Sequence, residues 1–450
     1  MIGIKDTFPS VSMDEWIQRL KKDLKADDLS VLHFNDEVEG ISFRAFEHSE
    51  SVITNSINPG DFPYTRGANP SGENWKNGKA ILVENEKSAN QQALNALMTG
   101  IDHLDFELSD DDINWNQLFE GVEFNYITCS FTVSNSQQLD YLLTELIPRY
   151  PLVIRINLDR HNGELYASEN KRITEKLKQK QAPIYLSDGY SLQQTGANCT
   201  QELAFMASTA HSYLVDLLDS GLSIDEAAAC IHFRAGIGSN YFIEIAKMRA
   251  LRHIWSSILK EYQPRHACSY VCQLSAKTGL LNKSAKDPYT NLLRQTTEVM
   301  SAVLGGAQTI VVTPYDLNTK TGPTELADRM ARNISLILKE ESYFHAVLDP
   351  LGGSYSLEKL TEELAQKGWK LFQDLEGMAG LRDCEARELL KVLVQNTRDI
   401  RLTEYDDKKR TLIGVTKFPN IQTIENSYLF SGNYLGIDNL IIERDMNYGN

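Results

Sequence analysis

A short polar run behind a strand-like segment contains the residues of this chain that are best suited to contact a ligand. Tyr190, Ser191 and Gln194 follow the apolar stretch from Ile184 to Leu186, and they carry a phenol, a hydroxyl and an amide. These groups donate and accept hydrogen bonds, so they can hold a polar ligand. No Gly-x-Ser-x-Gly turn surrounds Ser191, and the run therefore predicts a binding pocket without an activated nucleophile.

Two further motifs resemble ligand-binding loops only in part. Gly236-Ile237-Gly238 follows a predicted strand and opens a predicted helix, but Tyr241 stands where a dinucleotide loop has its third glycine. A tight turn is the favoured interpretation, and a ligand phosphate at the start of the helix is the alternative. The segment from Asp159 to Gly163, Asp-Arg-His-Asn-Gly, is typical of a polar turn.

Metal and redox motifs are absent from the sequence. It contains no His-Glu-x-x-His motif, and none of the nine histidines pairs with another at ligand spacing. The closest of the six cysteines, Cys268 and Cys272, lack the spacing of zinc and redox sites. We therefore expect no bound metal, and free thiols in a reducing compartment.

The charge and hydropathy of the chain exclude several classes of protein. The net charge of −16 argues against a nucleic-acid partner, which needs a basic stripe. No apolar run is long enough to span a bilayer, so we expect no membrane partner. Residues 1–10 lack the basic and apolar regions of a secretory signal, and the expected location is cytoplasmic.

The rest of the chain alternates between strand-like and helix-like segments. The candidate strands are His103 to Leu108, Tyr126 to Val133, Leu152 to Leu158, Ile184 to Leu186, Ile231 to Arg234, Ser269 to Gln273, Thr309 to Thr313 and Phe344 to Leu348. The amphipathic segments lie near Ser88 to Met98, Ser136 to Ile147, Asn170 to Lys178, Gln201 to Leu218, Asn240 to Tyr262, Pro288 to Leu304, Glu325 to Glu340 and Leu357 to Asp374. Eight alternations predict an α/β protein with a closed (β/α)8 TIM barrel, since eight tilted parallel strands close around a packed core.

Local signals mark the ends of two helices. Ser12 and Glu15 form a capping box, which predicts a helix to about Leu24. Asp287-Pro288 supplies an N-cap and a first-turn proline, and Gly305-Gly306 supplies a stop.

The barrel is expected to occupy the middle of the chain. Residues 1–78 are interpreted as an N-terminal extension, because residues 51–79 are rich in loop-forming types. The barrel is assigned to residues 79–380. Residues 381–450 are interpreted as a C-terminal helical and irregular segment, with one helix near Glu385 to Val394.

Six longer motifs resemble the barrel of the adenosylcobalamin-dependent methylmalonyl-CoA mutases. They are Pro63 to Gly67, Arg234 to Trp255, Asp287 to Gln308, Arg329 to Glu341, Leu348 to Tyr355 and Lys409 to Asn420. The resemblance covers nearly the whole chain. It implies the same barrel fold and a site that handles acyl-CoA esters over the ends of the strands.

Three places depart from the catalytic members of this family. Ser191 replaces a histidine that the resemblance places at the thioester carbonyl, and a serine is too short and uncharged for that role. Counted from Trp75 without gaps, a carboxylate-binding arginine falls on Gly78 and a tyrosine on Ala80. The glutamate expected at the ribose of the cofactor falls on Asn318, which lacks its charge. The resemblance thus implies a barrel with a degenerate site.

A cobalamin-binding domain with an Asp-x-His-x-x-Gly motif follows the barrel in this family, and we expect none in this chain. The resemblance implies a non-catalytic small (beta) subunit whose partner is a large (alpha) catalytic subunit. That partner would hold adenosylcobalamin and interconvert methylmalonyl-CoA and succinyl-CoA, so the pair forms an isomerase. We expect no cofactor on this chain itself, and a residual coenzyme A ester stays open as its ligand.

Two other functions stay open from the sequence. The chain can be a self-standing acyl-CoA mutase-like enzyme with altered substrate specificity, in which Tyr190, Ser191, Gln194 and Asn318 line the pocket. It can also be a scaffold or regulatory paralogue without a mutase partner, because a fold does not fix a function. Tight binding of one acyl-CoA ester would favour the first alternative, and native complexes without a large subunit would favour the second.

Overall fold

The structure is a computed structural model. It describes residues 10–51, 57–67, 74–109, 112–150, 154–157, 172–178, 182–419 and 432–446. None of the helices in these ranges combines the length and the apolar character that crossing a membrane demands. The turn predicted at Asp159 to Gly163 lies outside the described residues.

The centre of the molecule is one curled sheet of eight parallel strands, in the order β6-β5-β4-β3-β10-β9-β8-β7. Its strands are β3 (Lys76–Val83), β4 (His103–Leu108), β5 (Thr128–Thr132), β6 (Ile154–Asn157), β7 (Tyr185–Asp188), β8 (Ile231–Ile237), β9 (Leu274–Thr278) and β10 (Thr309–Val311). The two edge strands approach each other, because Ile156 N donates to Pro183 O at 3.0 Å, just before β7. The predicted parallel arrangement of the strands is confirmed, and this bond joins β6 to the segment just before β7.

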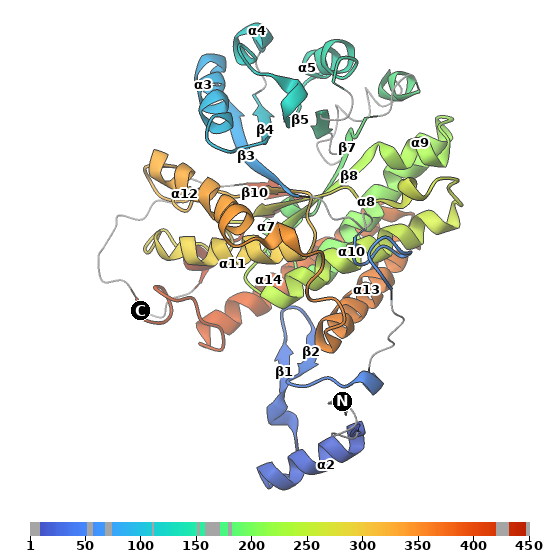
Figure 1. Ribbon diagram of the computed structural model, residues 1–450, viewed down its shortest axis with the longest axis vertical. Coiled ribbons are helices and arrows are strands. Elements are labelled where there is room, and N and C mark those ends of the chain that lie inside the picture. Colours follow the sequence, from blue (N-terminus) through green and yellow to red (C-terminus); the bar gives the residue numbers. More distant parts are fainter. Residues whose placement is uncertain are drawn as a thin grey trace, which may run out of the picture.

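Helices cover the outer face of the sheet (Figure 1). Those after the strands are α3 (Glu86–Leu97), α4 (Trp115–Leu118), α5 (Ser136–Tyr141), α7 (Gly189–Gln194), α8 (Cys199–Asp219), α9 (Ile224–Ala229), α10 (Tyr241–Glu261), α11 (Thr290–Leu304), α12 (Glu325–Leu336) and α13 (Tyr355–Glu376). The helices α8, α10 and α13 pack on one another and form a thick layer on one side. Buried apolar side chains of these helices and of the strands form the main core.

The strand β4 shows how the sequence separates the two faces of the sheet. Leu104, Phe106 and Leu108 are buried, and the Phe106 ring contacts the rings of Phe119 and Phe131. The alternate residues, from His103 to Glu107, are polar. Because successive strand residues point to opposite faces, this alternation puts apolar groups under the helices and polar groups inside the curl.

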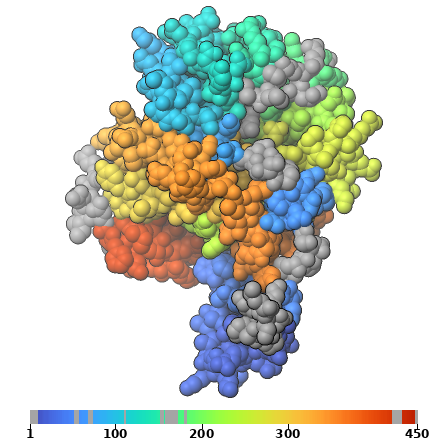
Figure 2. Space-filling model, in the orientation of Figure 1, coloured from blue at the N-terminus to red at the C-terminus, as the bar shows by residue number. Residues whose placement is uncertain are grey.

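An N-terminal arm, residues 10–50, projects from the body (Figures 1 and 2). It contains α2 (Met13–Leu24) and the hairpin of β1 (His33–Asp36) and β2 (Ile41–Arg44). The predicted capping box of Ser12 and Glu15 is confirmed. None of the α2 residues is buried, whereas the hairpin tip is anchored to the body through Glu39, whose carboxylate accepts from Cys199 N at 2.8 Å.

The chain after the sheet returns to the molecular body. The helix α14 (Cys384–Asp406) is longer than the predicted segment from Glu385 to Val394. The hairpin of β11 (Asn433–Tyr434) and β12 (Ile437–Asp438) and the single turn α15 (Ile442–Asp445) follow.

Two predicted strands are wrong, and one strand was not predicted. Phe344 to Leu348 is not a strand: Phe344–Ala346 form a 3-10 turn and Val347 is 58% exposed. Ser269 to Gln273 is not a strand either, because Ala267–Tyr270 form a 3-10 turn and β9 begins only at Leu274. The eighth strand is β3, which the patterns did not predict and which crosses the expected boundary between residues 78 and 79.

The predicted start of α11 is also wrong, whereas its predicted end is confirmed. The helix begins at Thr290 with Tyr289 as its N-cap, and Asp287 accepts a hydrogen bond from the Thr290 hydroxyl. Gly305 caps its end, and Gly306 has a φ of 78°, which a side chain would strain.

Candidate functional site

The predicted pocket residues Tyr190, Ser191 and Gln194 lie together on α7, at the carboxyl end of β7. Asp188 ends the strand and is the N-cap of α7. The Ser191 hydroxyl donates to Asp188 Oδ2 at 2.5 Å. Arg234 of β8 donates to both oxygens of the same carboxylate, at 2.8 Å and 2.7 Å. Ser191 is therefore already engaged in a buried, charge-assisted network.

Two ion pairs cross the interior of the curled sheet. Arg234 Nη1 on β8 lies 3.6 Å from Asp105 Oδ2 on β4. Lys277 Nζ on β9 lies 2.9 Å from Glu107 Oε1 on β4. In the strand order, three strands separate β4 from β8 on either side, so these two strands face each other. The two pairs thus fill the middle of the sheet with charged side chains.

The polar network continues from Asp105 toward β5. Ser130 Oγ donates to Asp105 Oδ1 at 2.9 Å, and His103 bonds to Ser130 Oγ at 2.9 Å and to Thr128 Oγ1 at 2.8 Å. Its side chains come from strands on both sides of the interior. The polar side chains of the interior are therefore held in place by hydrogen bonds to one another.

Burial and nearby charges shift the pKa values of Tyr190 and Asp188. Lys277 Nζ lies 5.0 Å and Arg234 Cζ 5.8 Å from the centroid of the Tyr190 ring. Burial raises the pKa of the Tyr190 phenol, so it stays protonated. Burial also acts to raise the pKa of Asp188, but Arg234 and the Ser191 hydroxyl outweigh it, and the pKa is lowered. Asp188 is therefore a fixed anion and not a proton acceptor near neutral pH.

Gly78 and Ala80 lie on β3, next to β4 and apart from α7. A Cβ at Gly78 would lie 2.8 Å from Val311 Cγ2, 3.1 Å from Ile310 O and 3.3 Å from His103 Cδ2. Because the oxygen belongs to a paired strand, it cannot move aside, and the position is closed to a larger side chain. No guanidinium fits at Gly78 without displacing β10.

Gln194 and Asn318 both form hydrogen bonds within the protein. Gln194 Oε1 accepts from Leu280 N at 2.7 Å, in the loop after β9. Asn318 is fully buried and donates to Lys283 O at 3.3 Å. Its Oδ1 has no hydrogen-bond partner among the described residues. The described contacts thus place Asn318 against the loop after β9 and not against Ser191.

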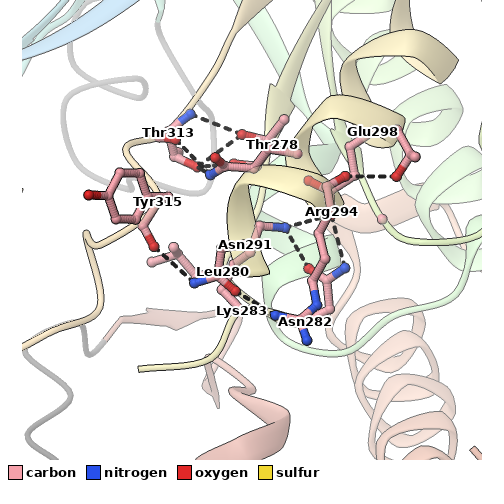
Figure 3. Close-up of polar contacts among 12 residues, drawn as sticks. Thr278, Leu280, Asn282, Lys283, Asn291, Arg294, Glu298, Thr313 and Tyr315 are labelled. Carbon is pink, nitrogen blue, oxygen red and sulfur yellow. Dashed lines mark hydrogen bonds and ion pairs between the residues drawn. The ribbon is translucent and has the colours of Figure 1, made fainter. Parts of the chain in front are cut away.

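Figure 3 shows how the loop after β9 is fixed to α11. Lys283 Nζ lies 2.5 Å from Glu298 Oε1, and Asn282 Nδ2 donates to the same oxygen at 2.9 Å. Asn291 Nδ2 donates to Tyr315 O at 2.9 Å, which joins α11 to the loop after β10. Buried polar contacts with α11 therefore hold the loop that carries Leu280 and the loop that carries Asn318.

The amides of both glycines at the end of β8 are already bonded to carboxylates of the same chain. Gly236 N donates to Glu202 Oε1 at 2.9 Å, and Gly238 N donates to Glu244 Oε1 at 2.9 Å. Lys247 balances these carboxylates from within the core, at 2.7 Å from Glu202 and 2.6 Å from Glu244. The two glycine amides are therefore not available to a ligand phosphate, which favours the interpretation as a tight turn.

The described part of the chain contains no group of three or more His, Cys, Asp or Glu side chains that could hold a metal ion. Its cysteines are free thiols, and four of them are buried.

The fold and the site together define an α/β protein with a polar, internally paired centre, and sequence comparison identifies its family. The family model described as methylmalonyl-CoA mutase matches residues 170–432. The chain belongs to the methylmalonyl-CoA mutase family.

Within this family it is a homologue of a small subunit. The chain is 30% identical over 444 residues to the methylmalonyl-CoA mutase small subunit of Porphyromonas gingivalis, covering 93% of this chain and 71% of that one. It is 37% identical over 230 residues to the methylmalonyl-CoA mutase of Rhizobium meliloti, covering 51% of this chain and 32% of that one. The human mitochondrial methylmalonyl-CoA mutase is 35% identical over 231 residues, covering 51% of this chain and 31% of that one. This chain therefore matches about a third of the length of these two mutases.

Solved structures resemble the chain only loosely. A dihydropteroate synthase from Thermus thermophilus matches 59% of this chain and 95% of its own, with 11% identity and a TM-score of 0.33. At such a TM-score the likeness says nothing about function.

Sequence reasoning missed the charged residues that occupy the site. Arg234 and Lys277 were not candidates, nor were Asp105, Glu107 and Asp188. A signal was present, because His-Leu-Asp-Phe-Glu-Leu alternates within a predicted strand, and an arginine interrupts the apolar run of β8. Polar residues at every second position of a covered strand indicate a polar interior.

Proposed function

We propose that this chain is the non-catalytic small subunit of a heterodimeric methylmalonyl-CoA mutase. Its large subunit would bind adenosylcobalamin and interconvert methylmalonyl-CoA and succinyl-CoA. The similarity to a small subunit over 93% of the chain supports this role. We also propose that the curled sheet closes as a (β/α)8 barrel where β6 meets the residues before β7.

The observation that carries the non-catalytic role is the pairing across the interior. Arg234 and Lys277 reach carboxylates of the opposite strand, and Asp188 holds the Ser191 hydroxyl. An elongated acyl-CoA ester would have to part these ion pairs to lie along the axis of the sheet. Parting the buried Arg234–Asp105 pair leaves a buried charge without its partner, which costs about 3–5 kcal/mol, so the paired state is favoured over an open channel.

The residue aligned with the ribose contact of adenosylcobalamin is closed off from solvent. Asn318, the position aligned with a ribose contact, is fully buried and its amide donates to Lys283 O. The position aligned with the arginine that binds the substrate carboxylate, Gly78, is enclosed by Val311 and His103. These observations support a chain that leaves both the cofactor and the substrate to its partner.

The N-terminal arm supports association with another chain. The helix α2 has no buried residue, and Trp16, Ile17 and Leu20 line an apolar hollow of about 160 Å³ beside the hairpin. Val31 and Phe34 are also exposed, at 78% and 53%. Apolar groups on a projecting arm are typical of a protein–protein contact. We propose that this arm contacts the large subunit.

The proposal is tested by assaying methylmalonyl-CoA isomerisation with adenosylcobalamin. The assay compares this chain alone, a catalytic large subunit alone, and the two mixed and purified as a complex. We expect no turnover from this chain alone, and a complex of one copy of each chain that is active. Turnover by this chain alone, or failure of the two chains to associate, would contradict the proposal.

A further inference from the structure

A pocket of about 240 Å³, the amino-end pocket, lies at the end of the sheet opposite to α7. Trp75 and Gln308 line it directly before β3 and β10, and Arg252 lines it from α10. Its apolar lining also includes Val303, Leu304, Ala307, Phe344, Val347 and Leu348. Because Val347 is 58% exposed, the pocket reaches the surface of the molecule.

Arg252 brings a buried positive charge to this pocket. It is 6% exposed, and within the described ranges its guanidinium donates only to backbone carbonyls. Nε and Nη2 donate to Thr65 O at 3.3 Å and 3.2 Å, Nη2 donates to Gly305 O at 2.6 Å, and Nη1 donates to Gly306 O at 3.5 Å. Burial lowers the pKa of Arg252 to about 10, so the group is still protonated at neutral pH. Carbonyl oxygens satisfy its N–H groups but do not neutralise its charge.

The neighbouring charges do not compensate Arg252. Asp349 also lines the pocket, but its Oδ2 already accepts from Arg66 Nε at 2.6 Å and from Arg249 Nη1 at 2.5 Å. Arg249 also donates to Glu358 Oε1 at 2.7 Å. Among these five side chains, three guanidinium groups share two carboxylates, which leaves an excess of one positive charge. Since buried charges in proteins are normally paired, this excess favours an anion in the pocket.

The size and the lining of the pocket define the rest of the ligand. The volume is below the roughly 300–1,000 Å³ of sites for drug-sized molecules, so the ligand is small. An apolar group would cover the apolar lining and remove it from water. A carboxylate carries one negative charge, which matches the excess, whereas a phosphate group carries about −1.5 to −2 charges.

We propose that the amino-end pocket binds a small carboxylate with an apolar tail. The carboxylate accepts from Arg252 Nη1, whose bond to Gly306 O is long, and the tail lies on Leu304 and Val347. This inference goes beyond the proposed subunit role and does not depend on it.

Calorimetric titration of the full chain, without any partner, tests the pocket with three probes. Sodium hexanoate has both the charge and the tail, sodium acetate has the charge with one methyl group, and 1-hexanol has the tail without the charge. We expect hexanoate to bind at least about 10-fold more tightly than either of the others, because it alone uses both sides of the pocket. Val347→Trp fills the pocket from its exposed rim and should weaken hexanoate binding about 10-fold. Val392→Trp, which enlarges an exposed valine on α14, should match the unchanged chain.

Three results would overturn the inference. No measurable binding of hexanoate would show that Arg252 serves only to hold the backbone around it. Equal affinities for hexanoate and 1-hexanol would show that the charge is not recognised. Undiminished binding of hexanoate to Val347→Trp would place the ligand elsewhere on the chain. Arg252→Gln should remove the preference for hexanoate over 1-hexanol, and Val347→Trp decides the matter if that buried change prevents folding. Because the partner is absent, these results are independent of whether the chain joins a large subunit.

Discussion

The Ser191 hydroxyl donates a hydrogen bond to Asp188, and Arg234 Nε and Nη2 donate to the same carboxylate. A residue in such a position organises charge but does not face a reacting group. Under the proposed non-catalytic role, the surroundings of Ser191 therefore matter as much as its own identity.

Restoring a histidine at this position should not restore turnover. In Ser191→His, the ion pairs of Arg234 and Lys277 would still cross the interior, and Gly78 would still offer no guanidinium. We expect no methylmalonyl-CoA isomerisation by this variant alone with adenosylcobalamin. Ser191→Ala serves as the matched control. Measurable turnover by Ser191→His would show that the serine at this one position is what makes the site inactive.

The stability of the chain should depend on the charge of Asp188. Its pKa is lowered in the folded chain from an ordinary value of 3.8, so below that value the unfolded chain binds more protons. The stabilisation is present at neutral pH and is lost as the pH falls through the lowered pKa. We expect the free energy of unfolding to fall below about pH 4, measured by urea denaturation. Asp188→Asn should be less stable at neutral pH and lose less on acidification, whereas Asp14→Asn should follow the unchanged chain. An equal acid slope in Asp188→Asn would contradict this account.

At the scale of elements, Arg234 joins three strands through Asp188 on β7 and Asp105 on β4. Its side chain is 13% exposed and the two carboxylates are 4% exposed. Arg234→Met leaves two buried charges without their partner, and we expect a loss of about 3–5 kcal/mol in the free energy of unfolding. Arg19→Met, which breaks an exposed pair with Asp23, should cost less than about 1 kcal/mol. A small loss of unfolding free energy in Arg234→Met would mean that the network does not stabilise the sheet.

The sequence predicted most strands of the sheet because covered parallel strands are short apolar runs between turn signals. The sequence patterns did not predict β3, because it begins with Lys-Asn-Gly-Lys and these residues have low strand propensity. Pairing with β10 and β4 supplies hydrogen bonds that outweigh this low propensity. Conversely, Phe344 to Leu348 has an apolar strand-like composition but no neighbouring strand, so it forms a turn.

The site was less predictable than the fold. Tyr190, Ser191 and Gln194 are adjacent in sequence, and their place behind β7 followed from the strand pattern. The pairing of Arg234 with Asp105 joins residues far apart in the chain, and it depends on which strands face each other. Sequence periodicity gives the direction of a side chain within one strand but not its partner across the sheet.

At the scale of the whole molecule, the proposal assigns the arm and the body different roles. Because α2 has no buried residue, deleting residues 1–25 should leave the body folded. We expect an unchanged thermal unfolding midpoint but weaker association with the large subunit, measured by sedimentation of the mixed chains. Trp16→Ala should weaken association, whereas Gln18→Ala on the exposed side of α2 should not. Full association without residues 1–25 would place the partner surface elsewhere.

The central claim is that this chain supports a reaction that it does not carry out. The most direct test is the turnover of the purified complex in which only this chain carries Tyr190→Phe and Ser191→Ala. The account predicts the same kcat and KM for methylmalonyl-CoA as the unchanged complex, because neither side chain touches the substrate. A kcat that collapses in this complex, with assembly intact, would contradict the account and place the reaction in this chain.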